Sequence, residues 1–412
     1  MSKHILIVPG VFPTLSETFI VNHITALIKR GFNVSIFSKR KGNTQSINNN
    51  IIKYKLLDLT YYQDLSKPTT FLKKILKCIY LVLLNSHKIK WNLLKKCIFN
   101  SSMNDMSFFD LFYKSFYFLT HKMPEIIHVH FGHNAILFCD LKKKGVILEH
   151  VKIIVTFHGF DLSIDQIENN KIKYRLLRET VSRFIVNSDY LLGVFKQTFP
   201  GNTQVSVIPV WPDLNLFSTL RKEKKNDFFN IVFCGRLIEL KGCEVALDIV
   251  ELLFKSNYKI KFHVIGDGDI LDKLIEISVN KEIDHIVTFH NSRSQKYIKT
   301  IFSKSQVFLL PGIKDPKTKR AETQGLVLQE AQASGLPVLV SDVGGMKYGM
   351  VNGETGFVLK ERDAQGFADK IIYLIENNDI LEKMSISSVR YVKENFQEDY
   401  LIERIIKEVY QF

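Results

Sequence analysis

Residues 320–341 read RAETQGLVLQEAQASGLPVLVS, and this stretch decides the class of the fold. Gly325 is placed to open a helix, because the apolar residues that follow it recur at helical spacing. Gly335 and Pro337 end that helix, and residues 338–341 form the next strand. A helix that leads directly into a short apolar strand predicts a βαβ unit with parallel strands.

The same alternation runs along the whole chain. Strands are predicted at residues 4–8, 34–37, 126–129, 153–156, 183–187, 205–208, 230–234, 261–265, 286–289, 307–310 and 338–341. Most intervals have the periodicity of helices, so we predict an α/β fold with two parallel sheets, and 412 residues suit two domains. Pro209, Pro212 and the charged run at residues 221–225 mark the connector. The first domain is therefore placed at residues 1–212 and the second at 213–395.

Charge and cysteine content limit the possible partners. The chain has 56 Lys plus Arg and 42 Asp plus Glu, a net charge of +14. Such an excess suits nucleic acid, an anionic membrane surface or a phosphate-bearing substrate, and it also simply keeps a chain soluble. Five scattered cysteines without a C-x-x-C pair favour a reducing cytoplasm over a disulfide framework or a zinc site. We expect neither a signal peptide nor a membrane span, because the apolar runs are too short.

Residues 67–120 interrupt the first series of strands with a basic, amphipathic helical insertion. Apolar residues alternate there with lysines, at Lys73, Lys74, Lys77, Lys88, Lys90, Lys95 and Lys96. One interpretation is a surface that lies on anionic lipid. The other is a solvated helix pair whose apolar face packs on the core, and both remain open.

Two glutamates lie near the start of the quoted helix. Glu322 precedes the helix and Glu330 lies within it. A helix N-terminus presents free N–H groups that suit a phosphate, and a carboxylate can accept two hydroxyls of a sugar. Two glutamates alone would indicate only a solvated helix, but glycine-rich, strand-flanked surroundings favour a binding site.

A second candidate follows the strand at residues 230–234. Gly235 ends the strand, and Arg236 and Lys241 project from its carboxyl end, where open parallel sheets bind their ligands. Arginine offers a planar fork to a diphosphate, and lysine offers a point charge. The alternative interpretation is a pair of surface cations.

The first half has its own candidates at strand ends. Residues 156–161, TFHGFD, place His158 to orient a substrate and Asp161 to accept a sugar hydroxyl. The loop after the first strand brings Gly10, Ser16 and Glu17 near the same cleft, with Ser16 as a helix N-cap.

One glycine turn resembles two other kinds of site. In residues 266–269, GDGD, the third glycine of a dinucleotide fingerprint would fall at Leu271, so that match fails. Turn propensity explains its two aspartates, so we expect no metal there.

These motifs together resemble glycosyltransferase family 4, whose members have the GT-B fold of two Rossmann-like domains facing each other across a cleft. Glu322 and Glu330 resemble its E-x7-E signature, residues 235–242 its diphosphate clamp and residues 157–161 its acceptor-side histidine motif. The likeness continues through residues 335–338, 344–345 and 352–357. Residues 12–20, FPTLSETFI, are similar to members that build bacterial exopolysaccharide and lipopolysaccharide. The resemblance covers nearly the whole chain and is least clear at residues 67–120.

The resemblance implies a retaining, metal-independent transfer of a sugar from a nucleotide-diphosphate sugar to a lipid-linked or saccharide acceptor. The product would be exopolysaccharide, capsule or lipopolysaccharide, made at the inner face of the plasma membrane. Arg236 and Lys241 would stabilise the leaving diphosphate. Glu330 would bind the ribose and Glu322 the sugar hydroxyls.

The resemblance also implies roles for the surrounding backbone. Gly235, Gly325 and Leu326 would contact the donor, and His158 would lie beside the reacting sugar. Residues 396–412 would form a helix that crosses back onto the first domain.

Two positions depart from the family pattern, and both concern donor contacts. Lys347 and Tyr348 stand where a Pro-Glu pair is common, and residues 210–212, VWP, replace the usual asparagine–glycine, with Asp213 kept.

Two other classes of function were weighed. A non-catalytic nucleotide- or sugar-binding protein on the same fold is the alternative, and it ranks lower because both the clamp and the histidine motif are present. We expect no nucleic-acid binding, because the chain has neither a recognition helix nor an aromatic-interleaved single-strand motif.

Overall fold

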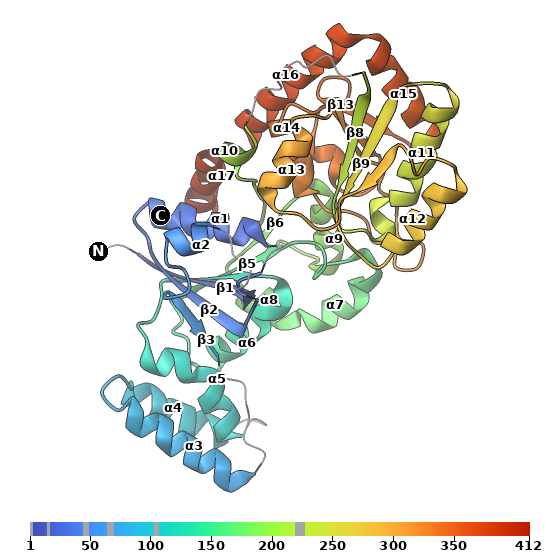
Figure 1. The fold of residues 1–412 in the computed structure, drawn as a ribbon. Coiled ribbons are helices and arrows are strands. Elements are labelled where there is room, and N and C mark those ends of the chain that lie inside the picture. Colours follow the sequence, from blue (N-terminus) through green and yellow to red (C-terminus); the bar gives the residue numbers. More distant parts are fainter. Residues whose placement is uncertain (1–2, 15–16, 44–48, 64–69, 103–106, 219–226) are drawn as a thin grey trace.

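The computed structural model describes residues 3–14, 17–43, 49–63, 70–102, 107–218 and 227–412. The strands of the first sheet are β1 (His4–Phe12), β2 (Asn33–Lys41), β3 (Thr60–Tyr62), β4 (Ile126–His130), β5 (Lys152–Phe157), β6 (Arg183–Val186) and β7 (Val205–Val207). Those of the second are β8 (Phe229–Cys234), β9 (Ile260–Ile265), β10 (Val287–Phe289), β11 (Val307–Leu310), β12 (Val338–Ser341) and β13 (Gly356–Leu359). Each sheet belongs to its own half of the molecule (Figure 1).

Both sheets are parallel throughout their described pairs, which confirms the predicted α/β class. The first has the order β3-β2-β1-β4-β5-β6-β7 and the second β10-β9-β8-β11-β12-β13. In each sheet the order reverses once, between β1 and β4 and between β8 and β11. Ligands of such sheets bind beyond the carboxyl ends of the strands at the reversal, so these two edges are the places to look for a site.

Every predicted strand is present, and β3 and β13 were missed. Both lie at a sheet edge and consist largely of half-buried residues, so they lack the fully apolar pattern of the inner strands. β1 also runs further than predicted, to Phe12. Gly10 therefore lies within the strand rather than in a loop after it, at an irregularity in the pairing of β1 with β2.

Helices cover both sheets. In the first half they are α1 (Thr18–Lys29), α2 (Asn49–Lys53), α3 (Phe71–Leu84), α4 (Trp91–Ser102), α5 (Phe108–Thr120), α6 (Gly132–Lys143), α7 (Ile167–Lys173), α8 (Arg175–Thr180) and α9 (Asp189–Thr198). In the second half they are α10 (Leu214–Phe217), α11 (Cys243–Lys255), α12 (Leu271–Asn280), α13 (Gln295–Phe302), α14 (Leu326–Ala333), α15 (Ala364–Glu376), α16 (Asn378–Asn395) and α17 (Glu398–Arg404). Single turns at Ile164–Gln166, Glu239–Lys241 and Met346–Gly349 and a last π-helical turn at Ile405–Tyr410 complete the structure.

The two faces of β1 explain why the first sheet needs helices on both sides. Leu6 and Val8 point into a core shared with α5 and α6, whereas Ile5 and Ile7 point into a core shared with α1. Alternate residues of a strand face opposite sides, so a strand that is apolar at every position must be covered twice.

The end of the chain returns to the first sheet, as expected. α16 packs on α14 of the second half, and the chain then turns at Phe396 so that α17 lies beside α1 (Figure 1). Leu401 and Ile402 join the core under α1. Arg30 forms ion pairs with Asp399 and Glu403, at 2.6 and 3.4 Å. Buried apolar side chains and ion pairs therefore both hold the C-terminal segment on the first half.

The insertion forms a separate lobe. α3 and α4 project from the first half on the side away from the second half, with α5 between them and the sheet (Figure 1). Within the described ranges, none of the helices combines the length and the apolar character that a bilayer crossing requires.

Candidate active site

The carboxyl edge of the second sheet brings together residues that lie far apart in sequence. Gly235 follows β8 directly, and the Lys241 side chain folds back over it, with Cε 3.8 Å from where a Gly235 Cβ would stand. The Lys241 ammonium forms a short ion pair with the Glu322 carboxylate. Both side chains are largely buried, so the pair is shielded from solvent screening.

Glu322 also organises the start of α14. Its Oε1 accepts the backbone N–H groups of Thr323 and Gly325, at 3.2 and 3.1 Å. Burial by itself would raise the pKa of Glu322, but the charge and the hydrogen bond of Lys241 outweigh burial and hold that pKa below its usual range. Glu322 is thus a carboxylate that neutralises Lys241 and holds the loop in front of α14, which begins after Gly325 as predicted.

Glu330, about one turn into α14, has a different environment. Its side chain is buried, and burial raises its pKa to about 8. A hydrogen bond from Gln295 opposes this rise, and the nearby charge of Asp213 adds to it. Glu330 is therefore mostly protonated at neutral pH, in contrast with the ionised Glu322.

Arg236 differs from Lys241 in being exposed at the same strand end. Its guanidinium has no hydrogen bond or ion pair with any residue that the structure describes. Of the two cations predicted to bind the diphosphate, Lys241 is therefore paired with Glu322, whereas Arg236 has no side-chain partner among the described residues.

Across the cleft, His158 follows β5 on a loop that Asp161 holds in place. The two carboxylate oxygens of Asp161 accept the backbone N–H groups of Gly132, His158 and Gly159, at 2.7 to 3.2 Å. Asp161 is buried, and burial raises its pKa against the effect of these hydrogen bonds. These contacts make Asp161 the anchor of the His158 loop, and its contact with a sugar stays a prediction.

The loop of Glu322 and the loop of His158 are in direct contact. The Thr323 hydroxyl donates to the His158 carbonyl at 3.0 Å and accepts from Asn187 at 3.3 Å. Gly159 allows this approach, since a Cβ there would lie 2.3 Å from the Thr323 methyl group. The two sheet edges therefore form one site.

Two further contacts join the halves on either side of Thr323. Gln324 pairs with the backbone of Val210, donating to its carbonyl at 2.7 Å and accepting from its N–H at 2.9 Å. Arg320 binds Asp165 with two nitrogens, at 3.1 and 3.4 Å. Residues 320–324 thus hold the two halves together at the cleft.

Behind His158 lies a buried chain of histidines. Hydrogen bonds link His158 to His130 at 3.0 Å, His130 to His23 at 3.2 Å, and His23 to the Tyr410 hydroxyl at 3.2 Å. The same hydroxyl contacts His128 at 2.7 Å. His23, His128 and His130 offer ring nitrogens within 4.8 Å of one another, so they are also a set of groups that could hold a metal ion.

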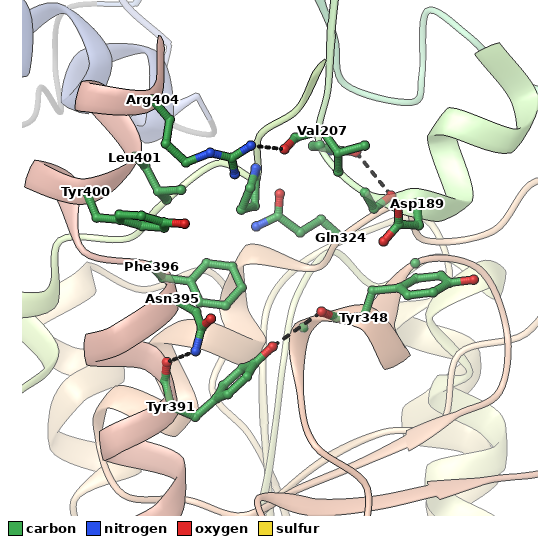
Figure 2. Close-up of a pocket in the computed structure, with 15 residues that line it drawn as sticks. Asp189, Val207, Gln324, Tyr348, Tyr391, Asn395, Phe396, Tyr400, Leu401 and Arg404 are labelled. Atoms are coloured by element: carbon green, nitrogen blue, oxygen red, sulfur yellow. Dashed lines mark hydrogen bonds between the residues drawn. The ribbon is translucent and has the colours of Figure 1, made fainter. Parts of the chain in front are cut away.

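A separate cavity lies where the chain crosses between the halves. It measures about 370 Å³, and Pro209, Gln324 and Phe396 contribute to its wall. Figure 2 shows the rings of Tyr348, Tyr391 and Tyr400 around it, with Arg404 donating to the Val207 carbonyl at 3.1 Å. We call this the hinge cavity, because it lies where the chain crosses between the halves. Tyr348 faces it, and the adjacent residue Lys347 forms an ion pair with Asp342. The wall of this cavity does not include Gly235, Lys241 or Glu330, so the cavity is distinct from the candidate active site.

The remaining predicted residues are distributed as follows. Leu326 begins α14, as expected from the sequence. Glu17 precedes α1 directly and is half-buried. The ring of Phe19 in α1 lies tilted against the His158 ring, with centroids 4.6 Å apart. Gly10 accommodates the Asn134 side chain, because a Cβ there would meet Nδ2 at 2.5 Å. Ser16 lies outside the described residues.

Sequence reasoning missed Thr323, Gln324 and the histidine chain. Thr323 and Gln324 stand inside the quoted stretch, but their partners lie at the end of the first half. His128 and His130 alternate along β4 and so share one face, beside the strand that leads to His158. That spacing was a usable signal.

The chain also resembles known glycosyltransferases in sequence. Residues 217–389 match the family model of glycosyl transferases group 1. The chain is 25% identical over 365 residues to the putative colanic acid biosynthesis glycosyltransferase WcaL of Escherichia coli, covering 87% of each protein. It is 24% identical over 373 residues to the amylovoran biosynthesis glycosyltransferase AmsK of Erwinia amylovora, covering 88% of each.

Solved structures share the fold. The Anabaena protein HepE, determined in complex with UDP, superimposes with a TM-score of 0.73 over the full length of both chains at 14% identity. The lipopolysaccharide outer core galactosyltransferase WaaB superimposes with a TM-score of 0.68 over 99% of both chains at 15% identity. The two facing domains thus have the GT-B fold.

Proposed function

Because this chain is a glycosyltransferase with a group 1 domain at residues 217–389, we propose that it uses a nucleotide-diphosphate sugar as donor. The acceptor is a lipid-linked or saccharide chain of a bacterial surface polysaccharide, and the sugar keeps its anomeric configuration. The contact of the Glu322 loop with the His158 loop through Thr323 carries the proposal, because it joins a diphosphate site to an acceptor-side loop. The names of WcaL and AmsK support the polysaccharide, and the UDP complex of HepE supports the nucleotide.

Lys241 and Arg236 are proposed to bind the departing diphosphate. In the free protein Lys241 is neutralised by Glu322, whereas Arg236 is exposed at the same edge. A diphosphate that binds there would compete with Glu322 for Lys241 and free the carboxylate for the hydroxyls of the donor sugar. Charge stabilisation of a leaving group is commonly the largest catalytic contribution, and losing one such contact costs roughly a hundredfold or more in rate.

Glu330 is proposed to bind the ribose of the nucleotide. It lies in electrostatic range of the Cys234 thiol, as does Lys241, so it stands beside the diphosphate site. The donor site is proposed to work without a metal ion, since two cations and a helix N-terminus already supply positive charge. Addition of a chelator should therefore leave transfer unchanged, and loss of activity on chelation would contradict this part of the proposal.

Donor binding can be tested first, without knowledge of the acceptor. UDP-, GDP- and ADP-sugars are screened for an increase in melting temperature, which follows affinity. The Lys241→Gln variant should lose the increase. Lys273→Gln is the matched control, because Lys273 forms an exposed ion pair with Glu244 in the same domain.

Transfer is then measured as nucleotide release from the selected donor in the presence of saccharide or lipid-linked acceptors. We expect release to depend on acceptor and to fall about a hundredfold in Lys241→Gln. Release at the wild-type rate in Lys241→Gln would refute the assignment of the clamp. An NMR measurement of the anomeric configuration of the product tests retention.

We further propose that the lobe of α3 and α4 places the enzyme on an anionic membrane, at its cytoplasmic face. One face of α3 is apolar and exposed to solvent, formed by Leu72, Leu76, Ile79, Tyr80 and Leu83, each at least half exposed. These positions recur at helical spacing, so they form one stripe. The stripe lies on the side of the lobe that the core leaves uncovered, while Cys78 of the same helix is buried.

The charge of the lobe supports a lipid partner. Residues 65–104 contain eight lysines and no acidic residue. An apolar stripe flanked by lysines matches a helix that lies in the headgroup region of an anionic bilayer. The five free, buried cysteines fit the reducing side of that membrane.

Vesicle flotation tests the membrane proposal. Wild-type protein should float with vesicles of phosphatidylglycerol and phosphatidylethanolamine, and weakly with phosphatidylcholine alone. Leu76→Ser/Leu83→Ser should reduce binding about tenfold or more, because two exposed apolar side chains are lost. Ile172→Ser/Ile386→Ser is the control, since these apolar side chains are also more than half exposed but lie outside the lobe. Equal flotation of the wild type and the α3 variant would refute the proposal.

A further inference from the structure

The buried histidine chain connects His158 with the far end of the protein. Beyond His128 it ends at the Thr156 hydroxyl, which lies 2.7 Å from Nε2 of His128. Its members come from β4, α1, β5 and the last helical turn of the protein, which contains Tyr410. His23, His128, His130 and Tyr410 are buried, whereas His158 is half exposed at the cleft. One end of the chain is therefore open and the rest is closed.

A neutral imidazole has one N–H donor and one acceptor nitrogen, so the hydrogen bonds along such a chain must all run in one direction. Burial lowers the pKa of His23 and of His158 to about 3, and it lowers the pKa of His128 and His130 well below the usual range. The four rings are thus neutral. Tyr410 has a single O–H, so it accepts a hydrogen bond from one neighbouring histidine and donates one to the other. The direction of donation therefore continues through Tyr410.

Two complete arrangements exist. In the first, donation runs from His158 towards Thr156, and the Thr156 hydroxyl accepts from His128. In the second, Thr156 donates to His128, His128 donates to Tyr410, and donation continues through His23 and His130 to Nε2 of His158.

Thr156 distinguishes the two arrangements. Its side chain is buried, and within the described part of the structure its hydroxyl has no hydrogen-bond partner other than His128. The first arrangement leaves the hydroxyl proton of Thr156 without an acceptor in a buried place, whereas the second leaves unpaired only the Nδ1–H of His158, the one ring that is partly exposed. A buried donor without an acceptor is strongly unfavourable, so the second arrangement is preferred.

We propose that Thr156 and Tyr410 hold His158 in one tautomer, with the proton on Nδ1, so that the cleft is offered a hydrogen-bond donor. Nδ1 is the ring nitrogen of His158 that forms no hydrogen bond within the histidine chain. Tyr410 is then a positioning residue, and the returning C-terminal segment helps to define the chemistry of the cleft. The use of this donor in sugar transfer rests on the proposed function, but the tautomer itself does not.

A metal ion is the competing use of these rings. His23 and His130 already share a hydrogen bond, and Tyr410 occupies the remaining nitrogen of His23 and one nitrogen of His128. A metal would have to replace these bonds in an enclosed site without a carboxylate among its ligands. The hydrogen bonds already satisfy the ring nitrogens that a metal ion would need, so a metal could bind only at the free-energy cost of breaking them.

The test is a two-bond proton–nitrogen NMR spectrum of the full-length protein labelled with ¹⁵N-histidine, with His158→Asn to assign the His158 signals. His158 should show a protonated Nδ1 and an unprotonated Nε2. Thr156→Val and Tyr410→Phe should each weaken this preference and give a mixture of tautomers, because at least one buried ring nitrogen is then unpaired in either arrangement. Tyr400→Phe, at an exposed tyrosine of α17, should leave the tautomer unchanged. Two variants at separate points of the chain keep the test valid if one of them does not fold.

A protonated Nε2 in the wild type, or a His158 signal that neither variant moves, would overturn the proposal. Stoichiometric metal in the purified protein, with a histidine spectrum that changes on chelation, would overturn it in favour of a metal site. If tautomer control is found but no donor supports transfer, the proposed function fails and this inference stands.

Discussion

Replacement of Glu330 by glutamine should stabilise the protein while weakening its binding of nucleotide. Glu330 is buried in α14, and burial raises its pKa to about 8 from an ordinary value of 4.5. The unfolded chain therefore ionises this group several pH units before the folded protein does. Glutamine has nearly the same shape and cannot ionise, so it removes the cost of keeping a carboxyl group neutral and buried.

The sign and the magnitude follow from the two pKa values. Because the folded pKa is raised, the contribution of Glu330 to stability is full below pH 4.5 and is lost as the pH rises towards 8. At pH 7 the loss is on the order of 3 kcal/mol, and at pH 5 it is below about 1 kcal/mol. Glu330→Gln should therefore be more stable than the wild type at pH 7 to 8, by up to that amount, and nearly equal to it at pH 5.

Unfolding by urea at a series of pH values measures this difference. Glu394→Gln is the control, because Glu394 is an exposed glutamate of α16. The same samples are titrated with the nucleotide selected by the donor screen, and Glu330→Gln should bind it about tenfold or more weakly. A stability difference that does not change with pH would refute the reasoning about burial, and unchanged nucleotide affinity would refute the ribose assignment.

Three further outcomes are expected. Nucleotide binding by the wild type should tighten as pH rises towards 8, by up to about tenfold per pH unit, because the ionised Glu330 accepts both ribose hydroxyls; titration calorimetry should show no such trend in Glu330→Gln. Gly345→Ala should destabilise the protein by about 2 kcal/mol or more in urea unfolding, since its Cβ would lie 1.7 Å from the Thr323 carbonyl oxygen, whereas Gly193→Ala, in open space, should be harmless. A double-mutant cycle with Arg320→Gln and Asp165→Asn should give a coupling of about 0.5–1 kcal/mol that high salt removes, because the pair is partly exposed; a coupling unaffected by salt would contradict this.

The inner strands and the site positions were predictable because their signals are local. A strand buried on both faces is apolar at every position, so β1, β5 and β8 are visible in the sequence alone. Likewise Lys241 and Glu322 were assigned correctly to a strand end and a helix start. Such positions follow from glycine turns and helix caps, which depend on neighbours a few residues away.

The partners of these residues were not predictable. Lys241 and Glu322 are 81 residues apart, and Tyr410 reaches His23 across 387 residues. The anchoring role of Asp161 was not predictable for the same reason, since it depends on the backbone N–H of Gly132 at the start of α6. Contacts of this kind depend on how the sheets and loops are placed in space, which periodicity does not encode.

The path of the chain between the halves has a mechanical consequence. The polypeptide crosses near Pro209 on its way out and near Phe396 on its way back, and both residues border the hinge cavity. A body held at two adjacent points can swing only about the line that joins them. Any swing that parts Thr323 from His158 also moves Gln324, which belongs to the cavity wall as well as to the cleft. An occupant of the hinge cavity would press on Gln324 and so oppose the separation of Thr323 from His158, without contacting Lys241 or Glu330, which are not part of the cavity wall.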